Sequence, residues 1–313
     1  MNDPLLQVRD LRVEFGGRAA LSGLSFDLFA GETLGLVGES GSGKTTLARA
    51  ILRLLRSAGG SVEFEGVNLL TCDPDTLRMR RRDLQIVFQD PLASLNPRLT
   101  VGESIAEPLR VFEPGLQPDA RRRRVGAMLE RVGLSADMAS RFPHEFSGGQ
   151  CQRIGIARAM TLGPKLLVCD EPVSSLDVSI QGQIINLLLD LQRDTGLAML
   201  FISHNLAVVR HLSHRVMVIY RGRTMEVAAA DALFAAPVHP YTRALLAVNP
   251  AVLTPARGPA SNAETSGCAY RHRCPYAIRV CEISEPPLAE AVAGHQVACH
   301  RSHETLNPLS FHA

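Results

Sequence analysis

An apolar segment, Leu34 to Val37, runs directly into Gly38-Glu39-Ser40-Gly41-Ser42-Gly43-Lys44-Thr45, and a helical pattern through Leu47, Ile51 and Leu54 follows. These eight residues match the pattern G-x-x-x-x-G-K-S/T, in which the backbone N–H groups of a glycine-rich loop wrap nucleotide phosphates. The pattern requires a strand before it and a helix after it, and both are predicted here. This stretch therefore predicts a nucleotide-binding α/β fold.

Each position of the loop has an expected role. Lys44 would reach the terminal phosphates, and the Thr45 hydroxyl would bind Mg²⁺. The residues expected to contact the nucleotide are Gly38, Glu39, Ser40, Gly41, Ser42, Gly43, Lys44, Thr45 and Thr46.

A second stretch, Phe146-Ser147-Gly148-Gly149-Gln150, also suits a phosphate. It opens a helix with small residues and a hydroxyl, so a phosphate oxygen could approach the exposed N–H groups. Two such half-sites on one chain suggest ATP sandwiched between two subunits.

The remaining strand candidates predict the architecture. Leu11, Val13 and Phe15, and likewise Leu24, Phe26 and Leu28, alternate with polar residues, as in half-buried antiparallel strands. Apolar strands are expected at 84–88, 166–169, 197–203 and 215–220, with a helix whose apolar face spans Ile180 to Leu191. We expect a RecA-like P-loop NTPase: a mixed, mostly parallel sheet with an antiparallel β subdomain.

Two further segments complete the expected organisation. Residues from about 90 to 160 carry several prolines among helical stretches and no convincing strand, which predicts an inserted α-helical subdomain. Prolines, histidines and cysteines cluster from Pro237 onward. We therefore expect a nucleotide-binding domain over 1–236 and a small cysteine-rich C-terminal extension over 237–313.

Polar residues at strand ends supply the other parts of a phosphoryl-transfer site. Asp170 would hold Mg²⁺ with Thr45, and Glu171 could polarise the attacking water; the alternative is a helix-capping pair. Gln89 could contact Mg²⁺ or sense water, and His204 could hydrogen-bond the γ-phosphate, although each could instead be structural. Phe15 could stack on adenine, with a core phenylalanine as the alternative.

Several motifs together resemble a known family. The loop at 38–45, Gln89, Phe146–Gln150, Asp170-Glu171, Ser175–Asp177 and His204 are similar, in order and spacing, to the nucleotide-binding subunits of ABC transporters over residues 5–236. The stretches at 89–98, 143–150 and 239–246 further resemble the bacterial oligopeptide/dipeptide importer ATPases, of the second-subunit type. That family also includes the ATPase subunits of nickel and glutathione importers.

The resemblance implies a mechanism and partners. Two subunits, either paralogous or identical, would pack head to tail, with ATP between Lys44 of one and Ser147, Gly148, Gly149 and Gln150 of the other. Asp177 would touch the partner subunit. Two transmembrane permease subunits would dock near Gln89, an extracytoplasmic solute-binding protein would act indirectly, and the chain would lie peripherally on the cytoplasmic face of the inner membrane. Departures from the family pattern occur at Cys151, Ser175 and Asn205.

Four cysteines lie near the C-terminus. Cys268, Cys274, Cys281 and Cys299 form a C-x5-C-x6-C-x17-C array. Its gaps are wider than those of common zinc fingers. Four thiolates are a ligand set for a 4Fe–4S cluster, and similar tails occur in the resembled family. Zinc and plain reduced thiols remain the alternatives.

Composition and charge limit the other functions. The net charge of +2 gives no overall reason to expect nucleic acid. The basic runs at 78–82 and 121–124 lack interleaved aromatic residues and indicate solvated helix faces. We expect neither a secretory signal nor a membrane span. The alternatives to transport are a soluble ABC ATPase of nucleic-acid repair or translation, and a regulator that binds ATP without hydrolysing it.

Overall fold

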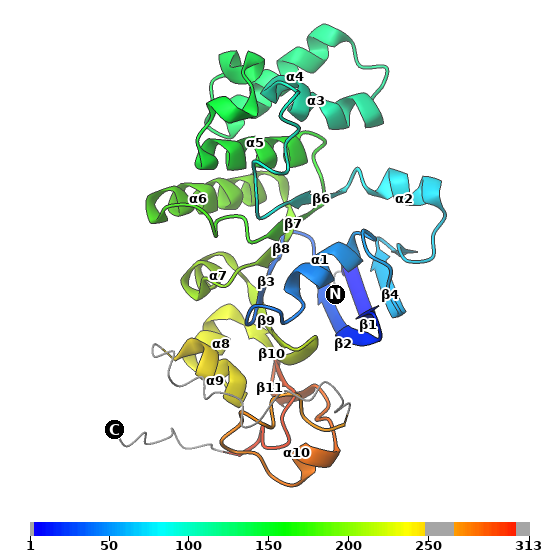
Figure 1. Ribbon diagram of the computed structural model, residues 1–313, viewed down its shortest axis with the longest axis vertical. Helices are drawn as coiled ribbons and strands as arrows, with labels where there is room; N and C mark the ends of the chain where they lie inside the picture. Colours follow the sequence, from blue (N-terminus) through cyan, green and yellow to red (C-terminus); the bar gives the residue numbers. More distant parts are fainter. Residues whose placement is uncertain (1–2, 248–265, 305–313) are drawn as a thin grey trace.

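The computed structural model describes residues 3–247 and 266–304, which form two sheets with helices around them (Figure 1). The strands are β1 (Leu6–Phe15), β2 (Arg18–Leu28), β3 (Thr33–Val37), β4 (Gly59–Phe64), β5 (Val67–Asn68), β6 (Leu84–Val87), β7 (Leu166–Asp170), β8 (Ala198–Ile202), β9 (Arg215–Tyr220), β10 (Arg223–Ala229), β11 (Ala289–Val292) and β12 (His295–Val297). The helices are α1 (Lys44–Ile51), α2 (Pro74–Arg80), α3 (Val101–Phe112), α4 (Pro118–Arg131), α5 (Gly148–Met160), α6 (Val178–Thr195), α7 (Leu206–Leu212), α8 (Ala230–Ala235), α9 (Pro240–Leu246) and α10 (Val280–Ile283), with short 3-10 turns at η1 (Ala136–Ser140) and η2 (Pro143–Glu145).

The larger sheet confirms the predicted α/β fold. Its order is β11-β12-β10-β9-β3-β8-β7-β6, and β9, β3, β8, β7 and β6 run parallel. The central strands β3, β7 and β8 are buried at every residue, because helices cover one face of the sheet and α1 covers the other. A parallel sheet covered on both faces requires the continuous apolar runs seen in the sequence.

The smaller sheet, in the order β2-β1-β4-β5, is antiparallel, as the alternating patterns predicted. Its inner face packs with α1 and the large sheet in one hydrophobic core. The helix α1 ends at Ile51 and does not reach Leu54, which is 48% exposed. Arg53 adopts a left-handed backbone (φ 49°), which stops the helix one turn earlier than its apolar pattern indicated.

Residues 90–160 hold α3, α4, η1, η2 and α5, which stand together at one end of the molecule (Figure 1). A capping box starts α3: Thr100 accepts from the Glu103 N–H, and the Glu103 carboxylate accepts from the Thr100 N–H. Buried apolar side chains of α3, α4 and α5 belong to the core that lies on the helical face of the large sheet.

The C-terminal extension lies at the opposite end, and it adds strands to the large sheet (Figure 1). Glu226 of β10 pairs with Val297 of β12, a connection that the sequence analysis did not foresee. Tyr241 and Tyr270 are buried in the same core as the sheet and its helices. The division into two domains at residue 236 stays a prediction.

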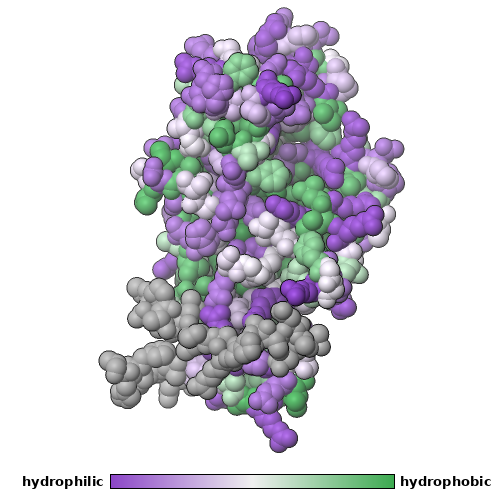
Figure 2. Space-filling view, in the orientation of Figure 1, coloured by the Kyte–Doolittle hydropathy of each residue, from purple (hydrophilic) through white to green (hydrophobic). Residues whose placement is uncertain are grey.

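On the face drawn in Figure 2, apolar residues occur in small groups among hydrophilic ones. Within residues 3–247 and 266–304, no helix combines the length and the apolarity that crossing a bilayer requires.

Candidate nucleotide-binding site

The candidate site lies where neighbouring parallel strands end. The strands β3, β8, β7 and β6 are adjacent and point the same way, so their carboxyl ends meet at one edge of the sheet. The phosphate loop follows β3, His204 follows β8, Asp170 ends β7 with Glu171 directly after it, and Gln89 follows β6. The fold therefore gathers at one edge the groups that the sequence analysis placed at separate strand ends.

The phosphate loop leads into an α1 whose amino end is open. Gly43 precedes α1 with φ 106°, no side chain caps the first turn, and the first turn contains no acidic residue. The first N–H groups and the helix dipole are therefore free to meet an anion. At Gly38, an added Cβ would lie 2.2 Å from the backbone oxygen of Ile219. The loop fits against β9 only because this residue is glycine.

Lys44 lies within the curl of this loop. Its Nζ donates to the backbone oxygens of Gly38 (2.9 Å) and Glu39 (3.0 Å), and the residue is buried. Burial lowers the pKa of the Lys44 ammonium, while the nearby carboxylates of Glu171 and Asp170 favour its charged form. A partly desolvated cation of this kind suits a phosphate ligand.

Of the three residues predicted to bind magnesium, Thr45 and Asp170 meet, whereas Gln89 contacts Glu171. Thr45 Oγ1 donates to Asp170 Oδ1 across 3.0 Å, from the first turn of α1 to the last residue of β7. Burial raises the pKa of the Asp170 carboxyl, and the hydrogen bond from Thr45 opposes that shift. A hydroxyl beside a carboxylate is an oxygen donor set that suits Mg²⁺, so the residues present fit this cofactor.

Glu171 contacts both of the other predicted catalytic residues. Its Oε2 lies 3.3 Å from Gln89 Nε2 and 3.2 Å from His204 Nδ1. Glu171 has φ 48°, a left-handed conformation that is uncommon for a residue with a side chain, and its N–H donates to the Ile202 oxygen (3.0 Å). Such conformations persist where the surrounding structure holds them, as here between β7 and β8.

Phe15 ends β1 and is 50% exposed. Leu11 and Val13 on the same strand are fully buried, so Phe15 does not share their place in the core. An exposed ring beside the turn at Gly16 and Gly17 fits a stacking surface. Its contact with adenine stays a prediction.

The stretch predicted as a second half-site opens α5. Ser147 caps α5: its Oγ accepts from the Gln150 N–H (3.3 Å), and Gln150 Oε1 accepts from the Ser147 N–H (3.0 Å). Ser147 and Gly148 are exposed. Asp177 is the N-cap residue of α6, yet its side chain makes no capping bond. Among the described residues, no hydrogen bond or ion pair joins these residues to the phosphate loop.

Two further residues, which no sequence pattern predicted, lie beside the loop. Arg273 and Tyr241, both from the C-terminal extension, contact Glu39. Tyr241 lies in the stretch 239–246 that carried the family resemblance. No local sequence pattern predicted that Tyr241 or Arg273 would contact the phosphate loop.

The four C-terminal cysteines line one small cavity, together with His239, His300 and Arg301. All are free thiols. Burial raises the pKa of Cys268 and Cys299, and it raises that of Cys274 to about 12. In the part of the chain that the structure describes, no group of three or more His, Cys, Asp or Glu residues is arranged to hold a metal ion. The cysteines therefore converge without forming a ready-made metal site.

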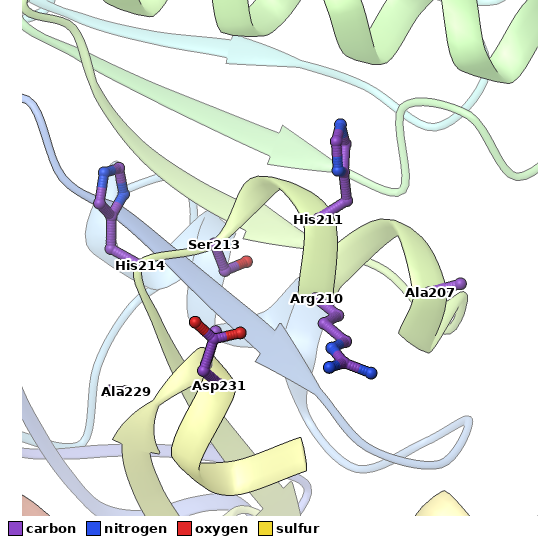
Figure 3. A pocket seen from close by; sticks show the side chains of 8 residues that line it. Ala207, Arg210, His211, Ser213, His214, Ala229 and Asp231 are labelled. Carbon is purple, nitrogen blue, oxygen red and sulfur yellow. The ribbon is translucent and has the colours of Figure 1, made fainter. Parts of the chain in front are cut away.

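A larger hollow of about 630 Å³ lies between α7 and α8, away from this chemistry (Figure 3). In Figure 3 the side chains of Arg210 and His211 leave α7 in different directions, and neither points toward Asp231. His214 Nδ1 already accepts from the Thr33 N–H (2.9 Å). The hollow gathers no convergent polar groups, so we assign it no site.

The phosphate loop, the acidic pair at the end of β7 and the capped helix α5 define a P-loop ATPase of the ABC class. Residues 21–174 match the family described as ABC transporter, and residues 225–281 match the oligopeptide/dipeptide transporter C-terminal region. The chain belongs to the family of ABC transporter ATP-binding proteins that carry this oligopeptide/dipeptide C-terminal region.

Curated relatives match along nearly the whole chain. It is 48% identical to the oligopeptide transport ATP-binding protein OppF of Escherichia coli (strain K12), over 94% of this chain and 95% of that protein. It is 47% identical to OppF of Salmonella typhimurium, with the same coverage of both chains.

Two solved structures share the fold. One is cbiO1 from Clostridium perfringens, part of the ABC transporter complex cbiONQ: its TM-score is 0.67 at 27% identity, covering 75% of this chain and 92% of that one. The other is a dimeric, post-hydrolysis structure of the ATP-binding cassette MJ0796 bound to ADP and Pi. Its TM-score is 0.65 at 28% identity, covering 72% of this chain and 98% of that one.

Proposed function

We propose that this chain is the ATP-binding and ATP-hydrolysing subunit that energises import of di- and oligopeptides through a membrane ABC transporter. The observation that carries the ATPase role is the meeting of Gln89, Glu171 and His204 beside the Thr45–Asp170 pair. The peptide substrate is supported by the OppF relatives and by the matched C-terminal region.

In this proposal each residue of the site acts on a positioned phosphate. The loop N–H groups and Lys44 bind the triphosphate, and Thr45 with Asp170 holds Mg²⁺, which supplies charge neutralisation when bound. Glu171 accepts the proton of the attacking water, because Asp170 is paired with Thr45 for the magnesium ion and Glu171 is the carboxylate that follows it. His204 and Gln89 orient that carboxylate through the contacts to its Oε2.

A second ATPase subunit, paralogous or identical, completes the site. Ser147, Gly148 and Asp177 are exposed and Gln150 is partly exposed, and within the described residues none of them bonds to the phosphate loop of its own chain, which suits contacts across an interface. The MJ0796 cassette was solved as a dimer. ATP would bind the closed pair better than the open pair, and this differential affinity would drive the permeases between their states.

The partners follow from this role. Two permease subunits would dock near Gln89 and the helical segment 90–160, which would place the chain on the cytoplasmic face of the membrane. A solute-binding protein would act on the far side of the membrane and would not touch this chain. Nucleic acid is not among the proposed partners.

Uptake in cells tests the transport role. Cells lacking this chain should lose uptake of a labelled tripeptide, and wild type should restore it while Lys44→Ala should not. Nickel and glutathione uptake, measured in the same cells, serve as controls for the other solutes of the resembled family. Loss of nickel or glutathione uptake with tripeptide uptake intact would reject the peptide assignment.

Purified protein tests the ATPase mechanism. With its partner subunits present, turnover per chain should rise with protein concentration, because each site needs two subunits. Full turnover from a chain that sediments as a monomer would contradict the shared site.

We also propose that Cys268, Cys274, Cys281 and Cys299 hold a 4Fe–4S cluster. All four line one cavity from separate segments of the extension, which supports a common ligand. Protein purified without oxygen should contain iron and sulfide and show broad visible absorbance. Cys274→Ser should lose the iron, the sulfide and the absorbance, whereas Cys72→Ser should keep all three. Zinc alone, or neither metal, would reject the cluster.

A further inference from the structure

One residue of the phosphate loop is held from the C-terminal extension. Both carboxylate oxygens of Glu39 accept from Arg273, which donates from Nη1 (2.8 Å) and Nη2 (2.9 Å). A two-pronged pairing of this kind sets orientation as well as distance. Arg273 immediately precedes Cys274, so the contact starts within the cysteine array itself.

The backbone of Glu39 is held at the same place. Its N–H donates to Tyr241 Oη (2.9 Å), and its carbonyl oxygen accepts from Lys44 Nζ (3.0 Å). The extension therefore contacts a residue whose own carbonyl holds the phosphate-binding lysine. A shift of Glu39 would move that carbonyl, and the lysine would lose one of its two backbone partners.

Arg273 is itself held in position. Its guanidinium lies over the rings of Tyr220 (5.8 Å) and Tyr270 (5.7 Å). These two rings lie 5.4 Å apart and pack against Tyr241 at centroid distances of 4.7 and 5.3 Å. The Arg273 side chain is 14% exposed and that of Glu39 28%. Partial burial and aromatic packing set this pair apart from an exposed surface ion pair, which contributes little.

The extension does not need this contact to stay attached. Arg223 of β10 pairs with Glu285, and the buried Glu226 pairs with His295 of β12 (2.6 Å). The strand pairing of β12 with β10 adds backbone hydrogen bonds. The Arg273–Glu39 pair is thus an additional contact, and it is directed at the phosphate loop.

We propose that Arg273 is a positioning residue for ATP binding, which holds the phosphate loop through Glu39 and so makes ATP affinity depend on the cysteine-rich extension. This inference rests on the proposed ATP site. The conformation of 268–281 and the occupancy of the phosphate loop would then influence each other, since coupling between two sites is reciprocal.

Affinity for a fluorescent ATP analogue tests the proposal. Arg273→Gln and Glu39→Gln should each raise its Kd about tenfold, within the range usual for coupled sites. The double variant should be no weaker than either single variant, because both remove the same contact. Arg273→Lys keeps the positive charge but loses the two-pronged guanidinium contact, so its Kd should lie between those of the wild type and Arg273→Gln. Unchanged Kd values in folded single variants would overturn the proposal.

A matched control separates positioning from attachment. Glu285→Gln removes another ion pair of the extension, one that involves no residue of the phosphate loop, and should leave the Kd unchanged. If it weakens binding as much as Glu39→Gln, the effect belongs to general loosening of the extension and the proposal fails. Lys44→Ala tests the ATP site itself, and normal ATP affinity in that variant would reject the proposed site. If Lys44→Ala binds ATP weakly but Arg273→Gln binds it with normal affinity, only this inference is rejected.

Hydrogen exchange separates coupling from a purely structural contact, because a purely structural contact would not make the exchange of 268–281 depend on ATP. A non-hydrolysable ATP analogue should slow amide exchange in 268–281 of the wild-type protein, and this protection should disappear in Arg273→Gln. Equal protection in both proteins would overturn the coupling.

Discussion

Glu171 at the end of β7 and His204 just after β8 meet with Oε2 and Nδ1 3.2 Å apart. Glu171 is largely enclosed, with 18% of its side chain exposed, whereas His204 is 62% exposed. The carboxylate is therefore anchored at the inner side of the site, and the imidazole lies at its open side. This arrangement suits a fixed base and a histidine that can reach a ligand.

Replacing the proposed base should separate binding from hydrolysis. Glu171→Gln should lower ATP turnover about 10²- to 10⁴-fold, the usual contribution of a positioned general base, and should leave ATP affinity near wild type. Turnover and equilibrium binding of ATP measure the two effects. Glu130→Gln, on the exposed face of α4, is the control. Unchanged turnover in Glu171→Gln would remove Glu171 from the base role.

Removing the phosphate-binding cation should weaken ATP binding. Lys44→Ala should raise the Kd for ATP about 10- to 100-fold, as expected for loss of a charged hydrogen bond. Lys165→Ala is the matched control, because Lys165 is a half-exposed lysine that pairs with Glu65 and lies outside the site. Wild-type affinity in Lys44→Ala would contradict the phosphate role.

Substitutions at Phe15 test whether its ring stacks on adenine or supports the hydrophobic core. Because half of Phe15 is exposed, Phe15→Ala should change the free energy of unfolding by less than about 1 kcal/mol, far below the usual cost for a core phenylalanine. Loss of stacking in Phe15→Ala should weaken ATP binding by about 1–2 kcal/mol, whereas Phe15→Tyr keeps an aromatic ring and should retain most of the ATP-binding free energy. Denaturant unfolding and ATP titration measure both. A large loss of stability with normal ATP affinity would indicate a structural ring.

Asp177 should affect association more than folding. Replacing an N-cap aspartate by alanine typically costs about 1 kcal/mol, but the Asp177 side chain makes no capping bond, so Asp177→Ala should cost less than about 0.5 kcal/mol. Asn205→Ala is the contrasting control, since Asn205 Oδ1 accepts from the Val208 N–H. In sedimentation with ATP and the Glu171→Gln substitution, Asp177→Ala should reduce the dimer fraction. An undiminished dimer would exclude Asp177 from the interface.

Stability should fall in mild acid because of His239. Burial lowers the pKa of His239 to about 4 from 6.5; the charge of Glu226 opposes this shift without overcoming it. Between these pH values the unfolded chain binds a proton that the folded chain does not. The contribution is therefore complete above pH 6.5 and is lost as the pH falls toward 4.

Urea unfolding should show this loss as about 2 kcal/mol between pH 7 and pH 5. In His239→Asn the side-chain oxygen can still accept the Tyr241 N–H that His239 Nδ1 accepts at 3.0 Å, and the titrating group is gone. The pH dependence should then be flatter by this amount. An equally steep dependence in the variant would assign it to other groups.

The meeting of the strand-end groups Asp170, Glu171, Gln89 and His204 was predictable from the sequence, because each follows or ends a strong apolar pattern. The buried strands β3, β7 and β8 are continuous apolar runs, and the residues that follow such runs in a parallel sheet must meet at one edge. The end of α1 was not predictable, because the left-handed backbone at Arg53 overrides an apolar pattern that continues to Leu54.

By itself, the sequence determined the phosphate loop, the parallel strands and the identity of the candidate catalytic groups, because backbone propensity and the spacing of apolar residues act over short distances. Only the tertiary structure decided which groups touch: that Gln89 and His204 share one oxygen of Glu171, that β12 joins β10, and that Arg273 reaches Glu39. Those contacts join residues far apart in the chain. They form where burial of the core brings the elements together, which no local pattern encodes.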